Sequence, residues 1–237
     1  DISRCSILLE SLYLVNSSII YELLIITPDS QLPVITKLLT GYITSLHFPI
    51  HFLHESSFFN SFTPSQAHPY AIQMALKLLV ASIIDTVAYI TLDADLILLR
   101  SFHWDQLVQS QSHRILYRHE RREEAHPMWW RGSEEMLGWR SSHPELQGFG
   151  VPPAVLTTHG ALLTVARLKE RYSEKEFEKE WILSFGRQVP MSDMQGDGTS
   201  PAERGRETET ETETETLTTE TQTETEIEIE SLLLCSD

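Results

Sequence analysis

Blocks of apolar residues alternate with amphipathic and polar segments along the first hundred positions of the chain. Tyr21–Ile26 is a short run rich in leucine and isoleucine, and the sequence "TPDS" at residues 27–30 follows it directly. This pattern predicts a strand that ends in a turn. A helix is predicted at Leu32–Leu39 and a second strand at Ile50–Leu53. Strands and helices that alternate in this way predict an α/β domain with a parallel sheet.

The next two elements have the strongest patterns. Within residues 65–85, apolar side chains recur with the i, i+3, i+4, i+7 spacing of an amphipathic helix, and Gln73 and Lys77 lie four residues apart on its polar face. The apolar positions are Ile72, Ala75, Leu76, Leu79, Val80 and Ile83. The helix leads into "VAYITL" at residues 87–92, which is apolar enough throughout to be a central strand covered on both faces.

The second half of the chain is less regular. Residues 113–118 predict a strand, and residues 119–147 are typical of a long irregular insertion. A helix is predicted to begin near Thr157 or Thr158, and a second helix follows it and ends at Gly186.

The last part of the chain has a different composition. From Glu203 onward it holds twelve acidic residues and two arginines, which is about −10 of the net charge of −16. Alternating Glu and Thr place like charges on one face without an apolar partner. We therefore expect residues 191–237 to be a disordered low-complexity tail, and residues 1–190 to form one domain.

The strict Glu-Thr repeat also resembles the translation of a simple DNA repeat. Our hypothesis is a gene-model or splicing artefact that replaces the true end of the domain and leaves it C-terminally incomplete. Sequencing of the mature transcript across the repeat tests this, and finding the repeat there would reject it.

The distribution of basic residues and the length of the apolar runs bear on whether the chain binds nucleic acid or a membrane. Lysines and arginines are scattered, and the densest basic run, "RHERREE" at residues 118–124, contains its own glutamates. We expect no nucleic-acid partner, because phosphate binding needs a basic stripe. No run of eighteen uncharged apolar residues occurs, so no membrane anchor is expected within this chain. The first residue is Asp1 rather than Met, so a signal or anchor could lie upstream of this chain. If the complete protein carries an N-terminal anchor, we expect a location in the Golgi or another secretory lumen.

Two aspartates stand where the predicted central strand ends. Asp93 and Asp95 lie within "YITLDADLILLR" at residues 89–100, and their i, i+2 spacing directs both carboxylates to one side of an extended chain. Two carboxylates buried so close together require a cation, a proton or solvent. Because oxygen ligands suit Mg²⁺ and Mn²⁺, the pair predicts a metal site at the carboxyl edge of the sheet, with a diphosphate as its natural partner.

"YITLDADLILLR", preceded by the helix with Gln73 and Lys77, resembles the DxD segment of GT-A-fold glycosyltransferases, particularly a poorly characterised group of nucleotide-diphospho-sugar transferase domains. "GFGVPPAVLTTHGALLTVARLKERY" is similar to that group's segment in which a Gly-Val-x-Pro-Ala run precedes a helix. The resemblance covers residues 21–186. It implies a GT-A-like, Rossmann-type, mostly parallel sheet with flanking helices. It also implies metal-dependent transfer of a sugar from a nucleotide-diphosphate donor to an unidentified glycan, protein or lipid acceptor.

The resemblance further implies roles for individual residues. Asp93 and Asp95 match the DxD positions, the first toward the nucleotide ribose and the metal, the second toward the metal and the diphosphate. Lys77 matches a basic helix position that contacts the donor, with a solvated helix face as the alternative, and Gln73 lies one turn earlier on the same face. These four residues are the predicted donor site, with Mn²⁺ or Mg²⁺ at the two aspartates.

Three other polar residues each have two interpretations. His159 is either a third metal ligand or a surface residue at a helix start. Thr27 and Asp29 either contact the donor or belong to a turn in which the aspartate caps the next helix.

The predicted insertion carries further candidates. Its tryptophans form either an acceptor platform or anchors that pin a long loop to the core, and these are Trp129, Trp130 and Trp139. Glu134 or Glu135 could supply a base, but both also suit a surface helix start, so no catalytic base is assigned.

Two other functions fit the motif. A haloacid-dehalogenase-like phosphatase also carries a DxD after an apolar strand, although this chain has Ile97 where that family has Thr or Val. Its later lysine and acidic-pair motifs are not evident. The second alternative is an inactive, truncated transferase domain.

Overall fold

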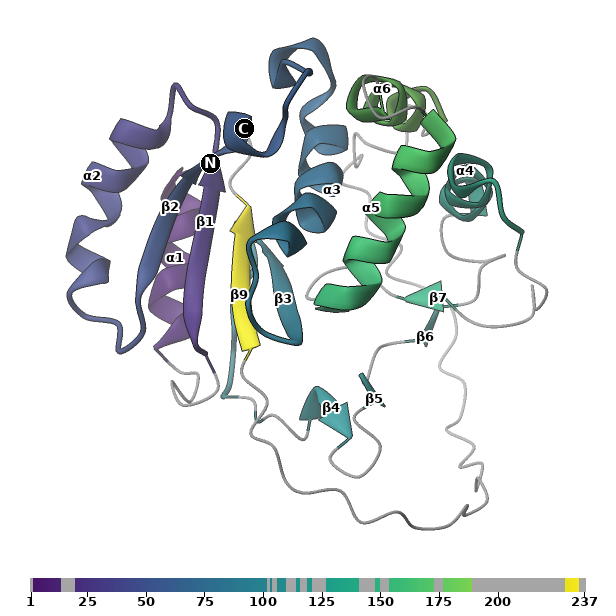
Figure 1. Ribbon diagram of the computed structural model, residues 1–237. Helices are drawn as coiled ribbons and strands as arrows, with labels where there is room; N and C mark the ends of the chain where they lie inside the picture. The colour runs from purple at the N-terminus through teal and green to yellow at the C-terminus, as the bar shows by residue number, and fades with distance from the viewer. Residues whose placement is uncertain are drawn as a thin grey trace, which may run out of the picture.

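A mixed sheet lies at the centre of the computed structural model, which describes residues 2–13, 20–101, 103, 106–109, 114–115, 119–120, 127–140, 148–149, 154–172, 177–188 and 229–234 (Figure 1). Its strand order is β2-β1-β9-β3-β8. These strands are β2 (Ile50–His54), β1 (Glu22–Thr27), β9 (Ile229–Leu234), β3 (Ala88–Asp93) and β8 (Ala154–Thr157). Strand β9 is parallel to both β1 and β3, β1 is parallel to β2, and β8 is antiparallel to β3.

Two further pairs of very short strands lie outside this sheet. They are β4 (Val108–Gln109) with β5 (Arg114–Ile115), and β6 (His119–Glu120) with β7 (Gly148–Phe149), and both pairs are antiparallel. The strand predicted at residues 113–118 therefore covers only two residues within the described part of the chain.

Helices flank both faces of the sheet (Figure 1). Figure 1 shows α1 (Ile2–Leu12) and α2 (Leu32–Ile43) beside β1 and β2, with α3 (Pro69–Leu79) and α5 (Thr158–Tyr172) on the other side. Helices α4 (Pro127–Leu137) and α6 (Phe177–Gln188) pack outside α5. Three short 3-10 turns complete the elements, namely η2 (Glu55–Phe58), η3 (Pro64–Gln66) and η4 (Val80–Ser82). The predicted α/β class with flanking helices is confirmed.

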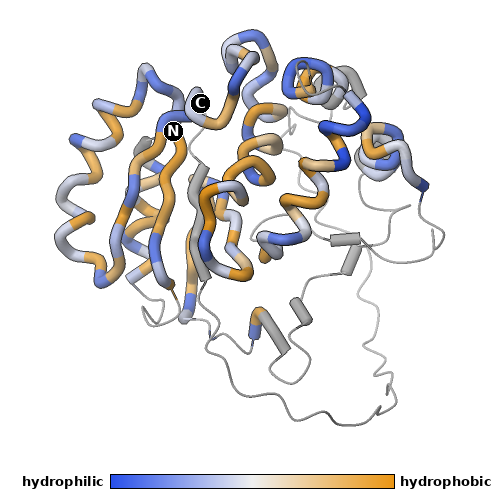
Figure 2. The backbone as a smooth tube through the Cα atoms, viewed as in Figure 1, coloured by the Kyte–Doolittle hydropathy of each residue, from blue (hydrophilic) through white to orange (hydrophobic). Residues whose placement is uncertain are grey.

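The alternation of side chains along β1 and β3 divides the interior into two cores. The α3 core joins Leu24, Ile26 and Tyr89 to buried residues of α3, α5 and α6. The α1 core joins Leu23, Ile25, Ile90 and Leu92 to buried residues of α1 and α2. In Figure 2 the tube of β1 is hydrophobic over most of its length, whereas α2 and α5 alternate between hydrophobic and hydrophilic residues. These patterns follow from a strand covered on both faces and from helices that bury one side.

Most elements of the first hundred residues agree with the sequence-based prediction. The elements that were not predicted include α1, β8 and α4, and α4 lies within the segment expected to be irregular. The second predicted helix also continues beyond Gly186 to Gln188. No helix in the described ranges is both long enough and apolar enough to cross a bilayer.

The tail differs from the expectation of disorder at one place. Residues 229–234 form β9 between β1 and β3, whereas residues 191–228 lie outside the described part of the chain. The sequence there changes from the Glu-Thr repeat to "IESLLL", which is apolar enough to pair within a sheet.

Candidate functional site

The carboxyl end of β3 positions the two aspartates of the DxD motif. Asp93 is the last residue of β3, and Ala94 and Asp95 lie in a turn that the Leu96 N–H closes on the Asp93 carbonyl at 3.1 Å. The expectation of an extended chain through both aspartates is therefore wrong, because the strand ends two residues before Asp95 and the alternation rule does not apply there.

Helix α3 supplies the partners of Asp93. Gln73 Nε2 donates to Asp93 Oδ1 at 3.1 Å, and Lys77 Nζ donates to the same oxygen at 2.8 Å. Gln73 and Lys77 reach one atom because residues four apart share a helix face. The helix begins at His68, whose Nδ1 accepts from the Tyr70 N–H, and has Pro69 at its first position. The structure thus brings together three of the four predicted donor-site residues.

Lys77 is buried rather than solvated. Its side chain is 8% exposed and that of Asp93 is 29% exposed, so the alternative of a solvated helix face for Lys77 is wrong. Burial lowers the pKa of the Lys77 amine, while the charges of Asp93 and Asp95 act in the opposite direction.

Two tyrosines without a predicted role also interact with Lys77 and Asp93. The Tyr89 hydroxyl donates to the Lys77 carbonyl at 2.6 Å and thereby ties α3 to β3. Tyr70 lies in the first turn of α3, where burial and, secondarily, the charge of Asp93 raise the pKa of its hydroxyl to about 12. Tyr70 belongs to no recognised motif, and Tyr89 begins the segment "YITLDADLILLR" without a predicted role there, so only the fold reveals their contacts.

Asp95 is much more accessible. Its side chain is 59% exposed, and its described ion pair is with Arg4 of α1 at 3.6 Å. Exposed pairs of this kind contribute little to stability, so the carboxylate can exchange this partner for another cation.

Asp93 and Asp95 fit a hard cation such as Mg²⁺ or Mn²⁺ in their chemistry. Both are oxygen donors, both reach solvent, and the two hydrogen bonds that Asp93 accepts from described residues end on Oδ1. Among the residues that the structure describes, no group of three or more His, Cys, Asp or Glu side chains is placed to hold a metal. Two carboxylates suffice for Mg²⁺, which keeps waters and substrate phosphates as its other ligands.

His159 lies at the opposite end of β3 from Asp93. Thr157 pairs with Ala88 in the antiparallel β3–β8 ladder, and His159 is exposed at the start of α5. The six residues from Ala88 to Asp93 span roughly 16 Å in a strand. The interpretation of His159 as a third ligand is therefore wrong, whereas Thr157 caps α5 as predicted, since its Oγ1 accepts from the Gly160 N–H at 3.1 Å.

An open cavity of about 630 Å³ lies at the carboxyl ends of β1 and β2. Gln73 lines it and so links the cavity to Asp93. Asp29 also lines it and accepts hydrogen bonds from Ser56 Oγ at 2.6 Å and Ser56 N–H at 3.3 Å. Burial opposes ionisation of Asp29, but Ser56 and His54 outweigh it and lower the pKa of the carboxyl.

Asp29 does not cap the next helix. The N-cap of α2 is Gln31, and it makes no side-chain cap hydrogen bond. The turn part of the prediction is confirmed, since the Gln31 N–H donates to the Pro28 carbonyl, but the capping part is wrong. Thr27 is fully buried, and no described residue partners its Oγ1.

The candidates from the predicted insertion lie on or beside α4. This helix packs chiefly on α5 and α6, which agrees with a role in anchoring the segment. Trp130 is half-buried and Trp139 is exposed, whereas the side chain of Trp129 lies outside the described residues. Glu134 and Glu135 belong to α4 itself.

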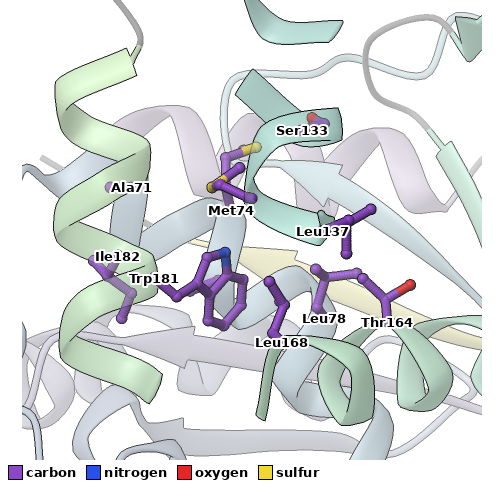
Figure 3. Close-up of a pocket in the computed structure, with 11 residues that line it drawn as sticks. Ala71, Met74, Leu78, Ser133, Leu137, Thr164, Leu168, Trp181 and Ile182 are labelled. Carbon is purple, nitrogen blue, oxygen red and sulfur yellow. The ribbon is translucent and has the colours of Figure 1, made fainter. Parts of the chain in front are cut away.

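A second, smaller cavity of about 130 Å³ lies between α3, α4, α5 and α6 (Figure 3). Trp181, Met74 and Leu78 are among its apolar lining residues, and Ser133 and Thr164 supply its hydroxyl groups. No ionisable side chain lines it, so it has no groups for acid–base chemistry.

Comparison with known proteins gives one match. Residues 1–194 match a family of unknown function, DUF6492. No curated protein and no solved structure is significantly similar to the chain. The comparisons therefore assign no activity to the site.

Proposed function

The chain belongs to the family of unknown function DUF6492, and we propose that this member transfers a glycosyl group from a nucleotide-diphosphate sugar, with a divalent cation at Asp93 and Asp95. The observation that carries the proposal is the position of Asp93, which Gln73 and Lys77 hold beside a cavity of about 630 Å³ at the carboxyl edge of the sheet. Open α/β sheets bind ligands at this edge, and ligand pockets commonly measure about 300–1,000 Å³.

Each residue of the pair has a distinct task in this proposal. Lys77 and Gln73 keep the Asp93 carboxylate in one orientation through their hydrogen bonds to Oδ1. Asp95, on the turn, supplies a second carboxylate that solvent can reach. A Mg²⁺ or Mn²⁺ ion bound at the two aspartates would neutralise the charge that develops on the diphosphate.

Metal-dependent nucleotide binding tests the proposal. We expect UDP or GDP with Mn²⁺ to raise the Tm of the full chain by about 5–10 °C at roughly one hundred times Kd. Asp93→Asn removes a charge from the site and should abolish the metal-dependent part of this shift. Asp85→Asn is the matched control, because it makes the same chemical change at an exposed turn before β3. The measurement is differential scanning fluorimetry with and without EDTA.

Two results would contradict the transferase. Hydrolysis of p-nitrophenyl phosphate that disappears in Asp93→Asn would indicate the phosphatase. The absence of metal-dependent stabilisation by any nucleotide would indicate a domain without a donor site.

A further inference from the structure

A carboxylate from α6 holds the loop that leads into the wall of the large cavity. Glu178 is 1% exposed, and its Oε2 accepts hydrogen bonds from the Asn60 and Ser61 backbone N–H groups, both at 3.0 Å. Asn60 N–H also lies 3.1 Å from Oε1. The side chains of Asn60 and Ser61 add longer contacts of 3.4 Å each. We call this arrangement the Glu178 clamp.

The Glu178 clamp explains how a carboxylate is tolerated in a buried position. Consecutive backbone N–H groups that converge on one point form an anion-binding concavity, and hydrogen bonds to a charged acceptor are stronger than neutral ones. Glu178 also lies in the first turn of α6, where the helix dipole favours a negative charge. The geometry is that of a built anion site whose anion is part of the chain.

The clamped residues are fixed on both sides by apolar anchors. Phe59 and Phe62 flank them, both are buried in the α3 core, and their rings meet edge to face at 5.9 Å. Residues 59–62 therefore have two side chains and two backbone N–H groups held by the rest of the fold.

The next residues form the cavity wall. Thr63, Pro64, Ser65 and Ala67 line the cavity of about 630 Å³, and they follow the clamped pair without an intervening element. Asp29 holds Ser56 in the same lining, but Asp29 is half-exposed, so solvent screens that contact more strongly. The Glu178 clamp is thus a buried set of hydrogen bonds to a carboxylate that holds the residues just before this wall.

We propose that Glu178 is a positioning residue for the donor cavity, which fixes the wall at residues 63–67 and thereby sets the affinity for a nucleoside diphosphate. The choice of ligand rests on the proposed function, whereas the clamp rests on the contacts of Glu178 alone. Without the clamp the wall has to be ordered when the ligand binds, and this ordering reduces affinity.

Glu178→Gln in the full chain tests the proposal. The substitution keeps the size of the side chain but turns one acceptor into an amide N–H₂ that faces N–H donors. We expect the Kd for UDP or GDP with Mn²⁺, measured by calorimetry, to rise about tenfold. Hydrogen exchange of a peptide covering residues 60–67 should become faster in the ligand-free protein. If the glutamine variant does not fold, Glu178→Asp replaces it, because the shorter side chain moves the carboxylate away from the backbone N–H groups by one methylene. The same rise in Kd and the same faster hydrogen exchange are expected.

Two control variants separate positioning from general stability. Glu180→Gln makes the same change at an exposed residue of the same helical turn and should leave both measurements unchanged. Val165→Ala removes volume from the α3 core and should lower the Tm without changing the Kd.

The possible results have distinct meanings. A wild-type Kd in Glu178→Gln, or an equal rise in Val165→Ala, overturns the positioning role. Failure of the wild-type chain to bind UDP or GDP refutes the proposed function, and with it the donor role of Glu178. Unchanged exchange at residues 60–67 refutes the clamp itself.

Discussion

Asp93 and Asp95 are held differently although one residue separates them. Asp93 ends a paired strand and accepts two hydrogen bonds from α3, whereas Asp95 lies in a turn with a loose ion pair to Arg4. Asp93 is therefore held in one orientation and would fix the position of the proposed cation. The exposed carboxylate of Asp95 is held less firmly and could adjust to that cation.

Loss of the Lys77 amine should destabilise the fold through Asp93. Lys77→Met leaves the carboxylate part-buried without its cation, and we expect the free energy of unfolding to fall by about 2 kcal/mol. Combining it with Asp93→Asn should restore part of this, giving a coupling of about 1–2 kcal/mol in a double-mutant cycle. Urea unfolding at neutral pH measures all four proteins. Strictly additive effects would show that the 2.8 Å contact carries no coupling.

The shared helix face of Gln73 and Lys77 could be predicted from the sequence, whereas their common partner could not. The helical spacing placed Gln73 and Lys77 on one face, but only the fold shows that both meet Asp93 Oδ1. Glu178 gave no signal, since an acidic residue in the first turn of a helix is ordinary and its partners are 118 and 117 positions away. Contacts of this range depend on how elements pack, which local patterns do not encode.

At the scale of elements, one hydrogen bond connects the helix and the strand that form the site. Tyr89 is fully buried in β3, and its hydroxyl donates to the carbonyl of Lys77 in α3. This hydrogen bond restricts the sliding of α3 along the direction of β3. The contacts of Gln73 and Lys77 with Asp93 require α3 to keep this position.

Tyr89→Phe should cost about 1 kcal/mol at neutral pH, because it removes this hydrogen bond. Burial raises the pKa of Tyr89 above the value of about 10 that applies in the unfolded chain. The Tyr89 hydroxyl therefore stays protonated to a higher pH in the native state than in the unfolded chain. Its contribution to stability is complete below pH 10 and falls as the pH rises further. The difference in urea midpoint between wild type and Tyr89→Phe should therefore be smaller at pH 10.5 than at pH 7.5. An unchanged difference would contradict the burial of the hydroxyl.

Element prediction succeeded where one pattern dominated. The apolar runs and the amphipathic spacing gave β1, α2, β2, α3 and β3. Helix α1 was missed although Cys5, Leu8, Leu9 and Leu12 have helical spacing and are buried. Helix α4 contains Gly132, which lowers helix propensity, so tertiary packing decides its state. Strand β8 is only four residues long, and its pairing depends on β3.

For the whole molecule, the sheet couples the two cores. Leu23 and Leu24 of β1 belong to different cores, as do Tyr89 and Ile90 of β3. A loss of packing on one face must therefore weaken the strands that support the other face.

Leu39→Ala in the α1 core should lower the free energy of unfolding by about 2–5 kcal/mol. Trp181 lies in the α3 core, so its fluorescence, isolated by replacing the other four tryptophans with phenylalanine, reports the opposite face of the sheet. If the sheet couples the cores, the urea midpoint from fluorescence should shift as much as the midpoint from circular dichroism. Separate midpoints would show that the two faces unfold independently.

The sequence distances within the site also set an order of assembly. Lys77 reaches Asp93 across sixteen positions, but the Glu178 clamp spans 118. Chains are made from the amino end and local contacts form first, so α3 can meet β3 while residue 178 is still unsynthesised. The cavity wall is then fixed only when α6 docks. A nascent chain would carry its aspartates early and gain a fixed cavity wall only later, so ligand retention would report the docking of α6.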